Sequence, residues 1–156
     1  MPDPAIAKVE VALGAVLDAY ASLADYTIVT GRDSSEAFDS SELPLINIFT
    51  EFQQFSPDGE QHQTMHDCRV SFEILENDLT PGVMSKTLQT AAAHIVAALA
   101  ADRTLGERLQ DLQEIDLAPP ADTGRDVAGA SLQYSVQFYT PRDDHFTING
   151  LGGLTF

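Results

Sequence analysis

Histidine and cysteine are the side chains of this sequence that most often carry chemistry, and the chain has four histidines and one cysteine. His62 and His66 stand four residues apart, a spacing that puts both on one face of a strand and could hold a metal ion. Their stretch is otherwise polar and rich in turn residues, so surface histidines are the better prediction. His94 lies among alanines within a predicted helix and is expected to be a residue at the boundary of the core and not a base, and His145 follows the last predicted strand. None has a nearby nucleophile that would complete a catalytic triad.

The other reactive features favour structure over chemistry. Cys68 falls on the apolar side of an alternating stretch, which predicts a small buried residue and not a reactive thiol. Gly150, Gly152 and Gly153 neither follow a strand nor open a helix, so they do not predict a phosphate-binding loop. We therefore expect that the protein is not an enzyme, and that it binds no cofactor and no metal.

Acidic side chains dominate the composition: 24 Asp and Glu face eight Lys and Arg, a formal net charge of -16. Cations supply most of the affinity for a nucleic-acid backbone, so this charge argues against sequence-specific nucleic-acid binding. The acids are dispersed along the chain, which predicts a soluble, self-repelling surface. Two alternatives stay open, an acidic docking face and a surface that repels or mimics DNA. The opening residues MPDPAIAKVE show no signal-peptide pattern, and no apolar run approaches the ~20 residues that span a bilayer, so no membrane partner is expected.

Two stretches show the three- and four-residue apolar spacing of a helix that buries one face. They are residues 3–24 and residues 80–102, and Asp3 and Thr80 are expected to cap them, each followed by a proline at the first helical position. The apolar stripe of the later helix is Met84, Leu88, Ala91, Ile95 and Leu99. The stripe of the earlier one is Ile6, Val9, Leu13, Val16, Leu17 and Tyr20.

Five stretches have the composition or the two-residue alternation of strands. They are Tyr26–Thr30, Leu43–Glu51, His66–Glu76, Gln113–Ala118 and Val127–Thr140. Residues 52–64 are expected to form the tip of a long hairpin, with Pro57-Asp58-Gly59 as its turn. Residues 102–110 predict a short helical turn that points Leu105 and Leu109 inward. Together the elements predict an α+β fold, a mainly antiparallel sheet of four to five strands with two main helices packed on one face.

The last residues are expected to be separate from a single domain at residues 1–144. Residues 145–156 are apolar at several positions, but their spacing matches neither helix nor strand, and a free apolar tail would be a liability in solution. We predict a docking arm that lies on its own subunit or on a neighbour, with a frayed terminus as the alternative. The interface candidates are Phe52, Phe55 and Pro57 of the hairpin tip and Phe146, Ile148, Leu151, Leu154 and Phe156 of the arm. Packing within the subunit is the alternative for each aromatic ring.

Four stretches share their patterns with one known family: LPLINIFTEF, DCRVSFEIL, AAAHIVAALAADRTLGERL and GASLQYSVQFYTPRDD. They contain a strand entered through proline, the strand Arg69–Ile74, an alanine-rich helix that runs into Asp102–Leu105, and the long strand Ala130–Phe138. On these patterns, over about residues 2–144, the chain resembles the tail terminator proteins of long-tailed bacteriophages and related gene-transfer particles. The arm has no counterpart in the resemblance.

The resemblance implies a structural virion protein. Such proteins form a ring, usually of six copies, that caps the last ring of the tail tube, stops its elongation and offers a surface for head attachment. The implied partners are further copies of the chain, the tail tube protein and a head-completion or connector protein. The implied location is the head-proximal end of the tail, with assembly in the bacterial host cytoplasm.

Three rival functions stay open. The nearest is another head-tail joining protein or a tail tube protein of the same particle, which would share the arrangement of helices on a sheet. An acidic adaptor or DNA mimic would rest on the charge alone and would bind a basic partner. An enzyme would need a pocket around His62, His66 or His94.

Overall fold

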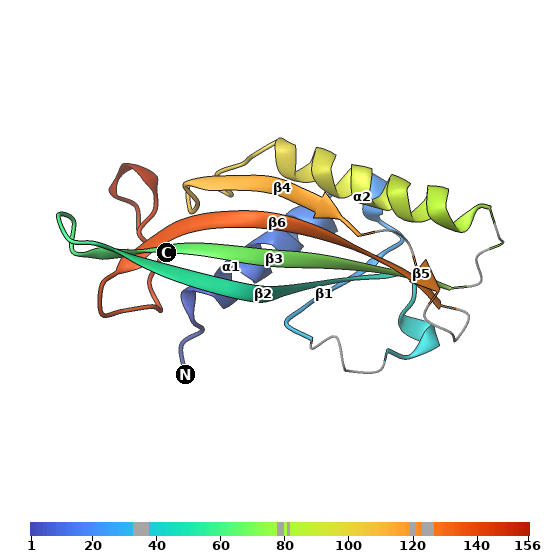
Figure 1. Cartoon of the computed structure of the whole chain (residues 1–156), viewed down its shortest axis with the longest axis horizontal. Helices are drawn as coiled ribbons and strands as arrows, with labels where there is room; N and C mark the ends of the chain where they lie inside the picture. Colours follow the sequence, from blue (N-terminus) through green and yellow to red (C-terminus); the bar gives the residue numbers. More distant parts are fainter. Residues whose placement is uncertain (33–37, 78–79, 81, 119–120, 123–126) are drawn as a thin grey trace.

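The computed structural model describes residues 1–32, 38–77, 80, 82–118, 121–122 and 127–156, and within them lie two α-helices and six strands (Figure 1). The helices are α1 (Ala5–Asp18) and α2 (Met84–Ala100). The strands are β1 (Thr27–Thr30), β2 (Leu45–Asp58), β3 (Gln63–Asn77), β4 (Asp111–Leu117), β5 (Ala121–Asp122) and β6 (Val127–Pro141). Short 3₁₀ turns lie at Ala21–Leu23, Ser40–Glu42 and Leu151–Gly153. None of the described helices is long and apolar enough to cross a membrane.

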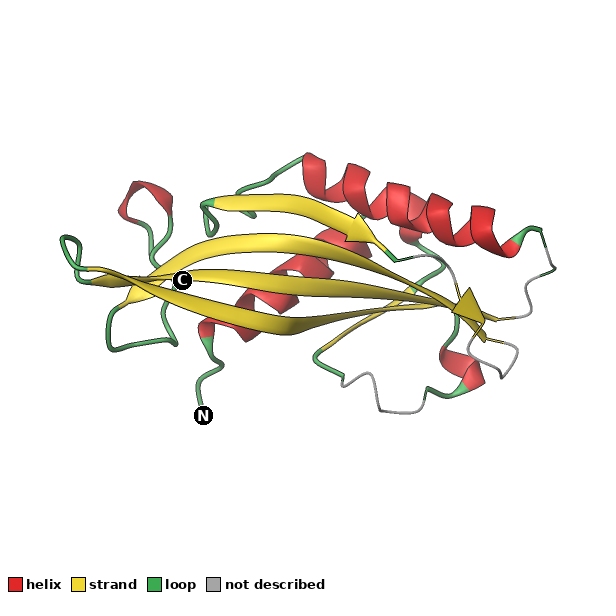
Figure 2. Ribbon diagram, viewed as in Figure 1, coloured by secondary structure: helices red, strands yellow, loops and turns green. Residues whose placement is uncertain are grey.

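The strands form one sheet in the order β1-β2-β3-β6-β4, with β5 paired to β6. Only β1 is parallel to its neighbour, and the other pairs are antiparallel. Both helices pack on the same face of this sheet, and Figure 2 shows α1 passing behind the strands. The predicted α+β class, with a mainly antiparallel sheet and helices on one face, is therefore confirmed.

The centre of the sheet is the long antiparallel pair of β3 and β6, matched from Gln63↔Pro141 to Asn77↔Val127. Along β6 every second residue from Ala128 to Thr140 is buried, as the sequence alternation predicts. The in-phase residues of β3 point to the same face and meet both helices, so one core lies between the sheet and the helix layer. Phe72 and Tyr134 pack edge to face in this core, with ring centroids 5.4 Å apart.

The helix stripes are confirmed, but the predicted helix starts are wrong. Val9, Leu13 and Leu17 of α1 are fully buried, and the middle of the α2 stripe is buried as well. Neither Asp3 nor Thr80 caps a helix, since α1 starts after Pro4 and α2 after Val83, both without a side-chain cap bond. The predicted proline at position 81 lies outside the described residues. The first helix also ends at Asp18, before the predicted end near residues 23–24.

In the hairpin of β2 and β3, the strands are longer and the turn is shorter than predicted. Pairing continues to Asp58↔Gln63, so Pro57 and Asp58 belong to β2 and the turn is residues 59–62. A bulge between Thr50 and Phe52 shifts the register once. Two long strands with polar tips can continue to pair beyond the hydrophobic core, because the backbone hydrogen bonds between them do not require buried side chains.

Residues 102–110 do not form the predicted helical turn. Leu105 and Glu107 have positive φ angles of 52° and 67°, which a helix does not contain. The Asp102 carboxylate instead accepts hydrogen bonds from the Thr104 hydroxyl (2.7 Å) and the Gly106 backbone N–H (2.6 Å). The inward placement of Leu105 and Leu109 is confirmed, because both are buried.

The chain after β6 folds back onto its own domain. Ile148 is fully buried in the main core, and its backbone N–H and C=O both pair with Phe156 at 3.0 Å. The Ala5 backbone N–H donates to the His145 carbonyl (2.7 Å), which ties the segment to the start of α1. The packing is tight at Gly150: an added Cβ would lie 2.5 Å from Phe156 Cε2 and 2.6 Å from the Glu107 carbonyl oxygen.

We predict that Gly150→Ala destabilises the protein by about 1–3 kcal/mol, because the methyl group must displace a backbone carbonyl and a ring. The free energy of unfolding, measured by denaturant titration, tests this. Gly59→Ala is the matched control: nothing lies within 4 Å of its Cβ position, and a change of less than about 0.5 kcal/mol is expected. Equal stability of the two variants would contradict the docked position of the C-terminal segment.

Candidate functional site

The face of the sheet opposite the helices is polar and largely uncovered. We call it the open face. Side chains of neighbouring strands bond across it: the Gln133 amide donates to the Glu51 carboxylate (2.6 Å), and the Ser71 and Ser131 hydroxyls lie 2.6 Å apart. The Asp67 carboxylate accepts hydrogen bonds from the Ser135 hydroxyl and the Gln137 amide, each at 3.4 Å. The open face is therefore an ordered polar surface that presents acceptors and hydroxyls to whatever lies against it.

The charge of the open face is mainly negative. Glu51, Asp67 and Glu73 lie on it, and Arg69 is the one cation that the described strands add there. Burial raises the pKa of Glu73, and the neighbouring Glu51 carboxylate raises it further. Like charges this close repel one another and any other anion that approaches.

The two edges of the sheet differ in how they are covered. β1 pairs only with Leu45–Ile48 of β2, and the chain leaves the sheet at Gly31, where φ is +72°. No other described strand pairs with the outer side of β2, so its part from Thr50 to Asp58 is an unpaired edge. At the opposite edge β4 pairs with β6 alone among the described strands. Unpaired edges are the usual places where another chain adds a strand.

The β4 edge is blocked at Leu112 by side chains. Its carbonyl accepts a hydrogen bond from the Arg103 guanidinium (2.9 Å), and its N–H donates to the Asp111 carboxylate (2.9 Å). Arg103 also pairs with Glu114 at 3.3 Å, with both side chains more than 40% exposed. An ion pair this exposed contributes about 0–1 kcal/mol, so it can be exchanged for a better one.

The hairpin-tip candidates lie at the free edge of β2. Phe52 is 56% exposed on the open face, opposite Arg69. Phe55 is 52% exposed on the helix side, and Pro57 lies in β2 near its end. The exposure of the two rings suits an interface.

His66 is the clearest case where the prediction from sequence is wrong, since it is 2% exposed and not a surface residue. Its ring stacks on Phe138 (4.5 Å between centroids) and meets the edges of Phe55 and His145. Its Nε2 lies 2.9 Å from the Thr140 hydroxyl, and its Nδ1 is buried without a hydrogen-bond partner among the described residues. Burial lowers the pKa of His66 to about 4, and His145 adds to the shift. The alternation could have found it, because His66 is in phase with the buried residues of β3.

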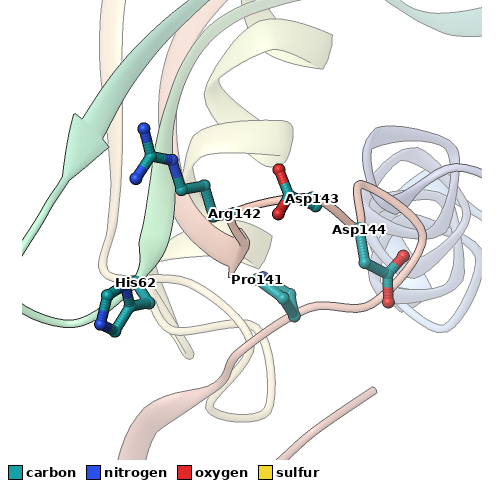
Figure 3. Close-up of a pocket in the computed structure, with 5 residues that line it drawn as sticks. All are labelled: His62, Pro141, Arg142, Asp143 and Asp144. Carbon is teal, nitrogen blue, oxygen red and sulfur yellow. The ribbon is translucent and has the colours of Figure 1, made fainter.

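The other reactive side chains are scattered. His62 lies in the β2–β3 turn and lines an open hollow with Pro141, Arg142, Asp143 and Asp144, whose side chains do not converge on one point (Figure 3). The His94 ring lies near the Tyr20 ring, with 6.1 Å between their centroids. Cys68 is buried as predicted, and burial raises the pKa of its thiol to about 12. In the part of the chain that the structure describes, no three His, Cys, Asp or Glu side chains gather as a metal site.

The five arm candidates have different surroundings. Ile148 is buried, and the Phe156 ring lies under the Arg108 guanidinium, 4.4 Å from its centroid. The Leu151 backbone N–H donates to the Glu107 carbonyl (2.8 Å). Phe146 and Leu154 are 45% and 43% exposed, so they are the arm residues that remain available to a neighbour.

Glu10 is a site that the sequence analysis missed. It lies on the sheet side of α1 and is 9% exposed, with no ion pair among the described residues. It lines a hollow of about 630 Å³ with Thr50, Glu51, Gly31 and Arg32, at the point where β1 leaves the side of β2. Burial raises the pKa of Glu10 to about 7. The Thr50 hydroxyl lowers this pKa by a smaller amount. That hydroxyl is buried and has no partner of normal geometry in the described structure.

Comparison with known proteins gives little. No known protein-family profile matches the sequence, and no curated protein sequence matches it. Among solved structures, a chain of the "Virion of native gene transfer agent (GTA) particle" is similar, at 12% identity and a TM-score of 0.37. The match covers 82% of this chain and 84% of that one. A likeness this distant carries no argument about function.

We predict that His66 makes stability fall as the solution is acidified from about pH 6.5 to about pH 4. The unfolded chain takes up a proton on this histidine in that range, whereas the folded chain does not. The loss should reach about 3 kcal/mol, because the ring is almost fully buried and one pKa unit is worth about 1.4 kcal/mol. Unfolding free energies of the wild type and His66→Gln across this range test it, with His62→Gln as the control that keeps the wild-type slope. A midpoint near 6.5 for the His66 ring by NMR would contradict the burial argument.

We predict that Glu10→Gln stabilises the isolated protein at pH 8 by about 1–2 kcal/mol and leaves it unchanged at pH 4. A carboxyl whose pKa is raised from 4.5 to about 7 favours folding only while it is protonated, so its contribution is lost as pH rises through that window. Glutamine mimics the protonated form at every pH. The measurement is denaturant unfolding at both pH values, and Glu60→Gln, in the exposed turn, should change neither.

Proposed function

We propose that this chain is a structural virion protein, and more narrowly a tail terminator that closes as a ring on the end of a tail tube. The main support is that the stretches that resemble this family are elements of one sheet-and-helix unit. They fall on β2, β3, β6 and α2, all of which contribute buried residues to the core. The resemblance therefore concerns the framework of the fold and not a peripheral segment.

The arrangement of the edges suits a ring. The strands alternate in direction from β2 through β3 and β6 to β4, so β2 and β4 run in opposite directions at opposite edges. A rotation about an axis along the strands would bring β4 of one copy beside β2 of the next in antiparallel orientation. A head-to-tail contact of this kind closes as a ring when the rotation divides a full turn, and the family resemblance implies six copies.

The acidic open face suits a DNA passage. In a ring built in this way, one side of the sheet faces the axis. If it is the open face, Glu51, Asp67 and Glu73 would line the lumen and repel the DNA backbone, so that DNA passes without sticking. Replacement of these acids with glutamine, without any change in DNA passage, would count against this role.

The exposed tips suit contacts with other virion components. Phe52 and Phe55 on the hairpin and Phe146 and Leu154 on the arm are exposed apolar side chains at one end of the molecule or near it. We propose that the ring meets the tail tube protein on one face and a head-completion protein on the other, and that these residues take part.

Solution mass by light scattering, with negative-stain images of the same sample, tests the assembly. A terminator should give six-fold rings that never lengthen. Long tubes would indicate a tail tube protein instead. A species that stays monomeric or dimeric and binds basic proteins would favour the acidic adaptor.

We predict that Phe52→Ser lowers ring formation by about tenfold or more, because it removes the largest exposed apolar side chain of the free β2 edge. The readout is the fraction of protein in the ring peak on size-exclusion chromatography. Val83→Ser is the matched control: Val83 is 51% exposed but lies at the start of α2, away from both sheet edges. Equal losses in both variants would show that exposed apolar area in general, and not the β2 edge, drives association.

A further inference from the structure

The hollow at Glu10 is lined by the carboxylates Glu10 and Glu51 and by Arg32, whose guanidinium pairs with Glu42, and it lies where β1 no longer covers β2. β1 fills the position beside β2 only as far as Ile48, and Gly31 then turns the chain away. The next part of β2 has an unpaired outer side, and the hollow opens beside it on the helix side of the sheet. Two buried polar groups face this space, the Glu10 carboxyl and the Thr50 hydroxyl, and neither has a cation or a normal hydrogen bond among the described residues.

Burial without a partner is unfavourable for a carboxylate, so an occupant with a positive charge would relieve it. A cation that reaches Glu10 would restore the ionised form and gain a partly desolvated ion pair, which is worth more than an exposed one. An extended segment with one Lys or Arg on its helix-side face would fit, since its backbone could pair with β2 while the side chain enters the hollow.

The chain itself offers a cation beside an unpaired strand. Arg103, in the loop before β4, lies along the other unpaired edge on the helix side of β4, where it bonds the Leu112 carbonyl and Glu114. Its present partners are weak, because the Arg103 and Glu114 side chains are 47% and 43% exposed. Two other described arginines are engaged with groups of their own: Arg32, which also lines the hollow, pairs with Glu42, and Arg108 donates to the Leu105 carbonyl and lies over the Phe156 ring.

We infer that two copies of this chain join edge to edge, with β4 of one copy beside the free part of β2 of the next, and with Arg103 of the first placed against Glu10 of the second. The inference rests on the proposed ring and names its subunit contact. On the helix side Arg103 exchanges Glu114 for Glu10, and its release also frees the Leu112 carbonyl to accept from the new strand. On the open face, Phe52 and Ile115 are exposed near opposite edges of the sheet, so the contact would bring Phe52 of one copy near Ile115 of the next.

The contact also explains why the β4 edge is blocked in the single copy. The acidic residues Asp111, Glu114 and Asp116 along β4 would repel another β4, whereas the free part of β2 between Phe52 and Pro57 carries no charge. The pairing of unlike edges is therefore favoured over the pairing of like edges, and association is directed head to tail.

The test is a double-mutant cycle in the association constant, measured by sedimentation equilibrium at pH 8. Glu10→Gln and Arg103→Gln should each weaken association by about tenfold, and the double variant should be no weaker than either one. Losses that multiply in the double variant would overturn the pairing. Glu60→Gln and Arg142→Gln are the controls, because both are exposed, Glu60 in the β2–β3 turn and Arg142 just after β6.

A charge exchange gives a second readout that a folding defect cannot imitate. Glu10→Arg and Arg103→Glu should each fail to associate alone, and a mixture of the two, or the double variant, should regain at least part of the wild-type affinity. Circular dichroism of each monomer checks that it is folded. If neither the mixture nor the double variant associates while all monomers are folded, the inference is wrong.

The failure of this contact can be distinguished from the failure of the proposed function. Six-fold rings that form equally well in all variants would overturn the Glu10–Arg103 contact and leave the terminator role supported. A wild-type chain that stays monomeric over the whole concentration range would overturn the inferred contact, whereas a ring that closes only on a tail would remain possible. Tubes in place of rings, with the charge effects intact, would confirm the contact and overturn the terminator role.

Discussion

The antiparallel pairing of β3 with β6 is the constraint on which the rest of this molecule depends. Both strands are 15 residues long, and they match in register from one end to the other. Because side chains alternate along each strand, this one register decides which residues of both strands lie under the helices and which form the open face. A slip by one residue would bury Arg69 and Gln133 and expose Val70 and Leu132. The two helices, the polar surface and the positions of both edges therefore all follow from this pair.

The protein places several polar groups where their solvation is incomplete, and these groups mark the parts of the fold with a further purpose. Asn47 is fully buried and holds the chain after β1 by donating to the Arg32 carbonyl (2.9 Å). His66 is kept neutral under the returning C-terminal segment. Glu10 differs from both, because it opens to a hollow beside an unpaired edge. Of these three described side chains, Glu10 is the one that lines a hollow another molecule could enter.

The two edges of the sheet differ in charge and in how they are covered. One edge is covered by β1 for four residues and then left open, with no charge between Phe52 and Pro57, and the other is short, acidic and blocked by Arg103 and Asp111. Two β4 edges would repel each other, whereas the stretch of β2 between Phe52 and Pro57 presents no charge to β4. The net charge of -16 by itself opposes self-association, so the contact inferred above depends on this local charge pattern.

The sequence by itself determined the elements whose signal is periodic. The two-residue alternation of residues 66–76 and 127–140 and the helical stripe from Leu88 to Leu99 predicted both strands, the buried face of α2 and the fold class. These patterns are reliable because they record which side of an element is removed from water along its whole length. The interface candidates Phe52 and Phe55 were also accessible to this reasoning, as large apolar residues in a polar stretch.

Only the tertiary structure decided the features that depend on contacts between distant residues. The helix starts moved away from Asp3 and Thr80 because packing, and not the capping residue, set where each helix meets the sheet. His66 is buried because Phe138 and His145 cover it, and Glu10 faces a hollow because β1 stops at Thr30. No local pattern specifies such neighbours. They are set by the register and the length of strands that lie far away along the chain.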